Sequence, residues 1–184
     1  MQEHMKDGET RMIPAEKLLL SDPTHVCVVV RDVEKTAETY ASLFGVGPFL
    51  IRMMRTPESH ASVGGKPAEY TLKFGYAKTS TITLELVETV QGRTAYSDFL
   101  DRHGEGIHHI GYKAAPPLDE ELRRWERLGI GTLQVNYRDD KRYGWAYVDT
   151  QAITGSIIEI VCDPALGWWE SLALAKDLKG PLGK

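Results

Sequence analysis

Apolar and polar positions in the first half of the chain follow a strand pattern and then a helical one. Residues 24–30 (THVCVVV) are rich in β-branched side chains and follow a Ser-Asp-Pro turn signal, which predicts a buried strand. Apolar residues then recur at helical spacing from Val33 to Phe44, with Asp32 at the N-cap and Gly45 at the end. Three more strand-like runs follow at residues 49–54, 69–77 and 81–88, with a Gly/Ser/Pro-containing loop at residues 57–67. The predicted order is β-α-β-β-β.

The second half of the chain repeats this order. Residues 106–113 (GIHHIGYK) predict a strand, residues 118–128 predict an amphipathic helix that ends at Gly129, and TLQVNY, GWAYVDT and SIIEIVC predict three further strands. Aligning His109 with His25 also aligns Glu159 with Glu85. Internal repetition of this kind indicates a duplicated supersecondary unit. We therefore predict an α+β protein of two βαβββ modules, each with a histidine on its first strand and a glutamate on its last.

The repeats define the predicted domain organisation. Residues 22–163 form a single domain, with repeat 1 at about residues 22–90 and repeat 2 at about residues 105–163, joined by a short helix at residues 96–104. We expect residues 1–21 to form a polar N-terminal arm. We expect residues 164–184 to form a C-terminal helical tail that packs on the domain or across a homodimer contact.

Composition and charge disfavour several classes of partner. The 184 residues include 26 acidic and 22 basic side chains, so the formal net charge of −4 provides no cationic surface for nucleic acid or an anionic membrane. The longest apolar runs are far shorter than the roughly 20 residues that span a bilayer, and the N-terminal residues do not resemble a signal peptide. The two cysteines, Cys27 and Cys162, lie in apolar runs, which favours reduced core thiols and a cytoplasmic protein.

Each repeat places one histidine and one glutamate on strands that are otherwise mostly apolar: His25 with Glu85, and His109 with Glu159. An ionised carboxylate in such a strand costs several kcal/mol unless it is paired or bound to a metal. Any one of these residues alone is more often a hydrogen-bonded or solvated side chain than a ligand. Their coincidence in both repeats favours one divalent metal ion held by all four. Two imidazoles and two carboxylates suit Co, Ni, Mn, Zn or Fe(II) without selecting among them.

The segments that carry these residues resemble the vicinal oxygen chelate superfamily, which includes the glyoxalases, bleomycin resistance proteins and dioxygenases. The resemblance covers about residues 22–163. Within the superfamily, SDFLDRHGEGIHHIGY (residues 97–112) and TGSIIEIV (residues 154–161) are similar to segments of the methylmalonyl-CoA epimerases. The resemblance implies paired curved mixed sheets around a metal-binding cleft, with the ligand positions carried over to His25, Glu85, His109 and Glu159. His108 is then expected to support a ligand or to pack beside it.

The same resemblance implies a metal-dependent isomerase that epimerises a small acyl-CoA such as methylmalonyl-CoA. The metal would stabilise the enolate formed when the carbon beside a thioester carbonyl loses its proton. Epimerisation also needs a proton-transfer group on each face of that carbon. Glu159 and Glu69 are the predicted catalytic residues, although the sequence around Glu69 differs from the epimerase motif and a solvated strand-edge role is an equal alternative. His60, in the loop at residues 57–67, can reach the mouth of a cleft.

Other functions stay open within the superfamily. A glyoxalase I-like lyase fits the His/Glu/His/Glu donor set, but the Thr-x-Asn-Trp-Gly run that follows the strand in glyoxalases is absent here. Ring-cleaving dioxygenases use two histidines and one glutamate, so Glu85 would have no role in them. The antibiotic-binding members lack a full ligand set, which makes a non-catalytic small-molecule binding protein a weaker alternative.

Overall fold

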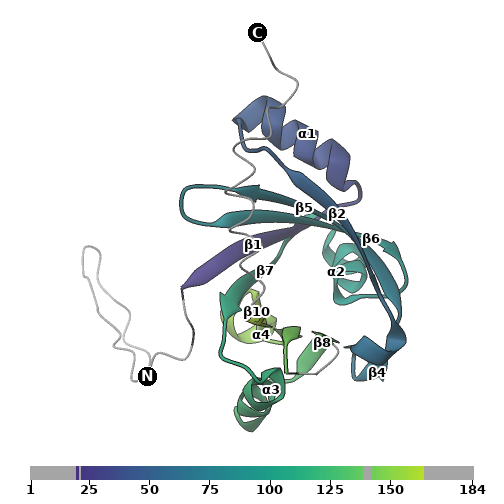
Figure 1. The fold of residues 1–184 in the computed structure, drawn as a ribbon, viewed down its shortest axis with the longest axis vertical. Helices are drawn as coiled ribbons and strands as arrows, with labels where there is room; N and C mark the ends of the chain where they lie inside the picture. The colour runs from purple at the N-terminus through teal and green to yellow at the C-terminus, as the bar shows by residue number, and fades with distance from the viewer. Residues whose placement is uncertain (1–19, 21, 139–141, 164–184) are drawn as a thin grey trace, which may run out of the picture.

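The computed structural model describes residue 20, residues 22–138 and residues 142–163. These residues form one ten-stranded sheet in the order β2-β5-β6-β1-β7-β10-β9-β8-β3-β4. The sheet curls into a half-barrel, with α1 outside the strands of the first module and α3 outside those of the second (Figure 1). The predicted α+β class is confirmed, and so is the βαβββ order of both modules.

The first module contains β1 (Pro23–Val29), α1 (Val33–Phe44), β2 (Leu50–Thr56), β5 (Tyr70–Lys78) and β6 (Thr83–Gln91). The second contains β7 (Gly106–Lys113), α3 (Leu118–Arg127), β8 (Thr132–Tyr137), β9 (Gly144–Val148) and β10 (Ile157–Cys162). Helix α2 (Ala95–His103) joins the modules, and the short α4 (Gln151–Thr154) lies between β9 and β10. The predicted arm and tail, and the homodimer contact expected from the tail, concern residues that lie almost entirely outside the described ranges.

Local sequence accounts for where the first helix begins and ends. The side chain of Asp32 accepts a hydrogen bond from the backbone N–H of Lys35, which satisfies one of the free donors at the start of α1. Gly45 adopts a φ of 65° at the other end, a left-handed conformation that glycine reaches without steric cost. Both capping positions match those predicted from the sequence.

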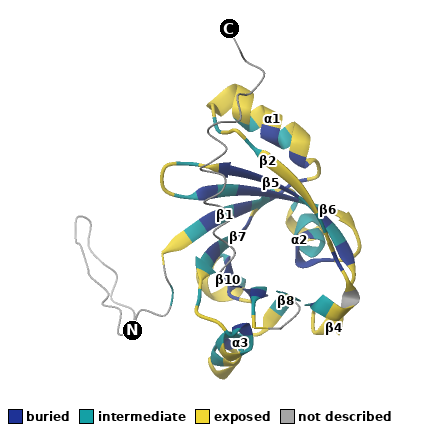
Figure 2. Cartoon of the chain, viewed as in Figure 1, coloured by how far each residue is buried: buried dark blue, intermediate teal, exposed yellow. Residues whose placement is uncertain are grey.

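The two modules join through their first strands. β1 pairs antiparallel with β7, and each of these strands pairs parallel with the last strand of its own module, β1 with β6 and β7 with β10. The four strands on which the sequence analysis placed histidine or glutamate are therefore neighbours, in the order β6-β1-β7-β10. Figure 2 shows buried residues along these strands, whereas β2, at one edge of the sheet, is mostly exposed.

The segment at residues 57–67, expected to be a loop, forms short ordered elements. It contains a 3-10 turn (Glu58–His60), β3 (Ala61–Val63) and β4 (Lys66–Pro67). β3 pairs antiparallel with β8 of the second module, so a first-module segment bridges to the far end of the sheet. This pairing joins residues distant in the chain, which local periodicity cannot reveal.

Two further predictions concern the state of the cysteines and the absence of a membrane-spanning segment. Cys27 and Cys162 are both buried and free, as expected for core thiols. Within the described ranges, every helix is too short or too polar to cross a bilayer. The cytoplasmic location stays a prediction.

A buried glutamine connects the modules near the bridging segment. Gln134 on β8 is 1% exposed; its Oε1 accepts from the backbone N–H of Ala95 at 2.7 Å, and its Nε2 donates to the hydroxyl of Tyr70 at 3.2 Å. The Gln134 side chain thus accepts a hydrogen bond from a backbone N–H at the start of α2 and links β8 to β5 of the other module.

We expect Gln134→Leu to lower the free energy of unfolding by about 1–3 kcal/mol, because it leaves the buried N–H of Ala95 without an acceptor. Urea unfolding followed by circular dichroism measures the change. The matched control is Gln91→Leu at the exposed end of β6, which should shift the free energy by less than about 0.5 kcal/mol. Equal losses in the two variants would contradict the role assigned to Gln134.

Candidate metal centre

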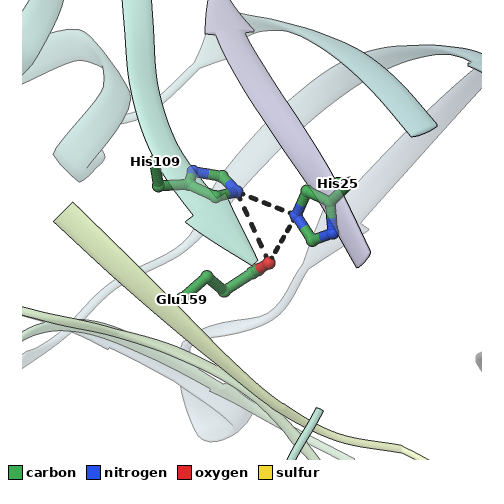
Figure 3. A group of neighbouring side chains, drawn as sticks. All are labelled: His25, His109 and Glu159. Carbon is green, nitrogen blue, oxygen red and sulfur yellow. Dashed lines mark hydrogen bonds and ion pairs between the residues drawn. The ribbon is translucent and has the colours of Figure 1, made fainter. Parts of the chain in front are cut away.

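Neighbouring strands bring the two predicted histidines and the two predicted glutamates to one place. His25 lies on β1, Glu85 on β6, His109 on β7 and Glu159 on β10. Gly111 of β7 pairs with both His25 and Glu159 in the sheet register, which brings β10 and β1 to either side of it. Figure 3 shows His25, His109 and Glu159 pointing toward a common centre.

The donor atoms are spaced like the ligands of a single ion. His25 Nε2 lies 3.0 Å from His109 Nε2, 2.7 Å from Glu159 Oε2 and 3.2 Å from Glu85 Oε2. His109 Nε2 lies 3.4 Å from Glu159 Oε2 and 3.7 Å from Glu85 Oε2. Ligands at about 2.1 Å from an ion are separated by about 3.0 Å in octahedral geometry and about 3.4 Å in tetrahedral geometry. The observed separations bracket both values.

One carboxylate oxygen of the set lacks a well-formed hydrogen bond to the residues that the structure describes, although the two imidazole Nε2 atoms are placed to share one. All four side chains are buried, and Glu159 Oε2 makes no hydrogen bond of good geometry within the described residues, although both imidazole Nε2 atoms approach it. A buried carboxylate oxygen in that condition is costly, and ligation to a cation removes the cost. The residues present therefore fit a divalent ion.

The surrounding charges give the two carboxylates different protonation states. Burial is the largest influence on Glu85 and, despite the opposing effect of His25, raises its pKa to about 8. Burial also acts to raise the pKa of Glu159, but the imidazoles of His109 and His25 outweigh it and hold that pKa well below its usual value. Without a bound ion, Glu159 is ionised and Glu85 keeps its proton through neutral pH.

The two histidines also differ. Burial lowers the pKa of both rings, but the carboxylates of Glu159 and Glu85 reverse this for His25, whose pKa is raised overall. For His109 burial dominates, and its pKa is lowered.

A third type of donor lies beside this set. Donor atoms of Cys27, Glu85 and His109 lie within 4.8 Å of one another, as do those of His25, His109 and Glu159. Burial, followed by the charges of the two glutamates, raises the pKa of the Cys27 thiol well above its usual value. The sequence analysis assigned Cys27 to the core; its two-residue spacing from His25 on one strand face was the available signal for a place near the site.

A cavity of about 390 Å³ opens onto the donors. The donor side chains that line it are His25, Glu85 and Glu159. Its remaining walls are rich in aromatic and basic side chains: Phe74, Tyr76, Tyr96, Trp145, Tyr147, Arg52, His60 and Arg138. His60 reaches the cavity as expected, because the bridging segment at residues 57–67 carries it there.

The sequence matches one protein-family model over residues 24–148, that of the glyoxalase/bleomycin resistance protein/dioxygenase superfamily. The chain belongs to this superfamily. Its members are commonly enzymes and typically bind a divalent metal. No curated protein matches the chain in sequence.

Several solved structures share this fold at low sequence identity. Methylmalonyl-CoA epimerase from Mycobacterium tuberculosis is 18% identical with a TM-score of 0.54, covering 85% of this chain and 97% of its own. A variant of Streptomyces coelicolor methylmalonyl-CoA epimerase in complex with 2-nitronate-propionyl-CoA is 20% identical with a TM-score of 0.55, covering 79% and 96%. A hypothetical protein from Bacillus halodurans is 14% identical with a TM-score of 0.53, covering 77% and 94%. These likenesses establish the superfamily fold.

Glu69, predicted as a catalytic base, is not brought to the donors. It lies just before β5, its side chain is half exposed, and its Oε1 accepts hydrogen bonds from Arg55 Nη2 at 2.5 Å and Nε at 3.1 Å. It is not among the residues that line the cavity. Its catalytic role stays a prediction, and the exposed ion pair is the arrangement found here.

Gly111 provides the space for the His25 ring. A Cβ atom at this position would lie 2.0 Å from Cε1 of His25, far inside any normal contact. The sequence shows a glycine two residues after His109, but nothing in it indicates that a ring from another strand lies against that glycine.

We expect Gly111→Ala to weaken Zn²⁺ binding by about tenfold or more, since the new methyl group displaces a ligand. Competition with a chromophoric chelator measures the Kd. Gly106→Ala, on the same strand, is the matched control because its Cβ would meet only Phe99, at 3.9 Å. Wild-type affinity in Gly111→Ala would show that the position of His25 does not matter for the ion.

We also expect Glu85→Gln to raise the Tm of metal-free protein more at about pH 9 than at about pH 5. Because the folded-state pKa of Glu85 is raised to about 8, its contribution to stability is present at low pH and is lost as pH rises through that value. Glutamine stays neutral and avoids that loss. With added Zn²⁺ at high pH, the wild type should instead have the higher Tm, because the variant lacks a ligand for the ion.

Thermal unfolding in the presence of a chelator measures the effect. Glu126→Gln, on the exposed side of α3, serves as the control and should change Tm equally little at both pH values. The same Tm increment for Glu85→Gln at low and high pH would contradict the protonation state assigned to this carboxyl group.

Proposed function

We propose that the protein is a divalent-metal-dependent isomerase that epimerises a small acyl-CoA such as methylmalonyl-CoA. The observation that carries the proposal is the convergence of four donor side chains, one histidine and one glutamate from each repeat, beside a cavity. The fold shared with methylmalonyl-CoA epimerases, including one in complex with methylmalonyl-CoA, supports this choice of chemistry.

His25, Glu85, His109 and Glu159 would hold the ion. A bound divalent ion supplies Lewis acidity that polarises a substrate carbonyl and stabilises the negative charge left when the neighbouring carbon loses its proton. The four side chains contribute by keeping two imidazoles and two carboxylates in place inside a buried site, where electrostatic interactions are strong.

The cavity suits the acyl part of the proposed substrate. Its volume of about 390 Å³ is at the low end for small-molecule sites, so the acyl group would be enclosed while the carrier lies outside. Arg52 and Arg138 bring positive charge to its walls, which suits an acyl group that ends in a carboxylate. Arg138 is itself held by Asp163, with Nε 2.7 Å from Oδ2.

Two residues that line the cavity are proposed for proton transfer. Glu159 carries a carboxylate at the border of the cavity, so it is proposed as one of them in addition to serving as a ligand. His60 carries an imidazole, the side chain most often used in general acid–base catalysis. Glu69, predicted from the sequence, is the alternative to His60 as the second proton-transfer group. Its ion pair with Arg55 would have to break before it could act.

The test is exchange of solvent deuterium into methylmalonyl-CoA under anaerobic conditions, with Co²⁺ added. We expect metal-dependent exchange and interconversion of the epimers by the wild type, and a fall of about 10²–10⁴-fold in His60→Gln if that imidazole transfers a proton. His103→Gln, at the exposed end of α2, is the matched control and should retain wild-type exchange.

Other outcomes would replace the proposal. Consumption of oxygen with Fe(II) and a catechol-type substrate would indicate a ring-cleaving dioxygenase. Turnover of a hemithioacetal would indicate a glyoxalase I-like lyase. Binding of small molecules without exchange or turnover would indicate a binding protein of the same fold.

A further inference from the structure

Thr24 occupies an irregular step of β1, immediately before His25. The register with β7 shifts between Pro23 and His25, so Thr24 is an extra residue in β1 at this point. A β-bulge of this kind re-aims side chains and is frequent beside active sites. In a regular strand Thr24 and His25 would point to opposite faces. Here Thr24 Oγ1 lies 3.0 Å from His25 Nδ1.

The single hydroxyl hydrogen of Thr24 is already donated elsewhere. Oγ1 lies 3.1 Å from the carbonyl oxygen of Gly111 and donates to it, since a carbonyl oxygen can only accept. Toward His25 the same oxygen must therefore act as the acceptor, and the hydrogen between them belongs to Nδ1 of the ring. Nε2 of His25 faces Glu159 Oε2 at 2.7 Å, an acceptor for a hydrogen on that nitrogen, so a cation bound at Nε2 would take the place of that hydrogen while Nδ1–H stays on Thr24.

We propose that Thr24 is a positioning residue that holds the Nδ1–H of His25, and with it the orientation of the ring, when Nε2 binds a metal ion. That nitrogen faces Glu159 Oε2 at 2.7 Å and Glu85 Oε2 at 3.2 Å, at the proposed position of the ion. Gly111 takes part twice: its carbonyl accepts from Thr24, and its missing side chain leaves room for the ring. Both effects come from one residue of β7.

His109 is held in a different way. Its Nδ1 lies 2.9 Å from Nδ1 of His108, and either ring can supply the hydrogen between them. Nε2 of His108 makes no hydrogen bond of good geometry within the described part of the chain. The Nδ1 of His25 therefore faces a hydroxyl oxygen that can only accept, whereas the Nδ1 of His109 faces a second ring that can donate or accept.

The proposal rests on the metal site proposed above, and two substitutions test it. Thr24→Val keeps the shape of the side chain without the hydroxyl, whereas Thr24→Ser keeps the hydroxyl. Contacts that orient a ligating histidine change metal affinity about 10–100-fold, so Thr24→Val should raise the Zn²⁺ Kd by that factor and Thr24→Ser by no more than about threefold. Thr132→Val, at an exposed strand position, is the control for the substitution itself and should leave the Kd unchanged.

The hydrogen bond is measured separately, by proton–nitrogen NMR correlations that detect the Nδ1–H of His25 with and without Zn²⁺. We expect this signal at the wild-type position in Thr24→Ser and shifted upfield in Thr24→Val, because the valine offers no acceptor. If the wild type binds no Zn²⁺, the proposed metal-dependent function fails while the NMR result still decides the role of Thr24. An unshifted Nδ1–H signal in Thr24→Val, or its loss in Thr24→Ser, would overturn the proposal.

Discussion

Two imidazole nitrogens and two carboxylate oxygens meet inside a sheet that gives them almost no contact with water, and this meeting constrains the rest of the site. The separations between imidazole and carboxylate atoms run from 2.7 to 3.7 Å, close enough for all four side chains to contact one ion. Burial opposes ionisation of both carboxyl groups; the histidines keep Glu159 ionised, whereas Glu85 retains its proton. A cation at the centre would take the place of the protons that the metal-free site holds.

The duplicated fold brings the four side chains together through strand pairing alone. Each module provides a first strand with a histidine and a last strand with a glutamate, and pairing of the two first strands makes the four strands neighbours. The sheet then curls around the centre, so that residues from β2, β5, β8 and β9 line a cavity beside it. The bridging strand β3 adds a first-module contact to β8 and brings His60 to the cavity wall. Chemistry and substrate enclosure therefore come from the same sheet.

Backbone details refine the ligands after the strands have placed them. The bulge at Thr24 brings a hydroxyl next to the His25 ring. The carbonyl of Gly111 accepts a hydrogen bond from that hydroxyl, and the absence of a side chain at Gly111 leaves room for the ring. Neither detail changes the element order or the ligand identities. The first holds one side of the imidazole and the second leaves room for the ring, and the orientation of a ligating histidine affects metal affinity.

Periodicity and repetition along the chain predicted the two modules, the caps of α1 and the strands that carry His25, Glu85, His109 and Glu159, because each of these depends on neighbours a few residues apart. The distances between the four donors, the pairing of β3 with β8 and the ion pair of Glu69 with Arg55 depended on contacts between distant segments.

The sequence pattern around Thr24 could not predict the bulge either, because a bulge is defined by the pairing with a partner strand. The residues alone therefore determined which side chains were available for chemistry. Their protonation states, the cavity beside them and the space at Gly111 came from tertiary packing, because burial and close approach are properties of the folded arrangement and not of any one segment.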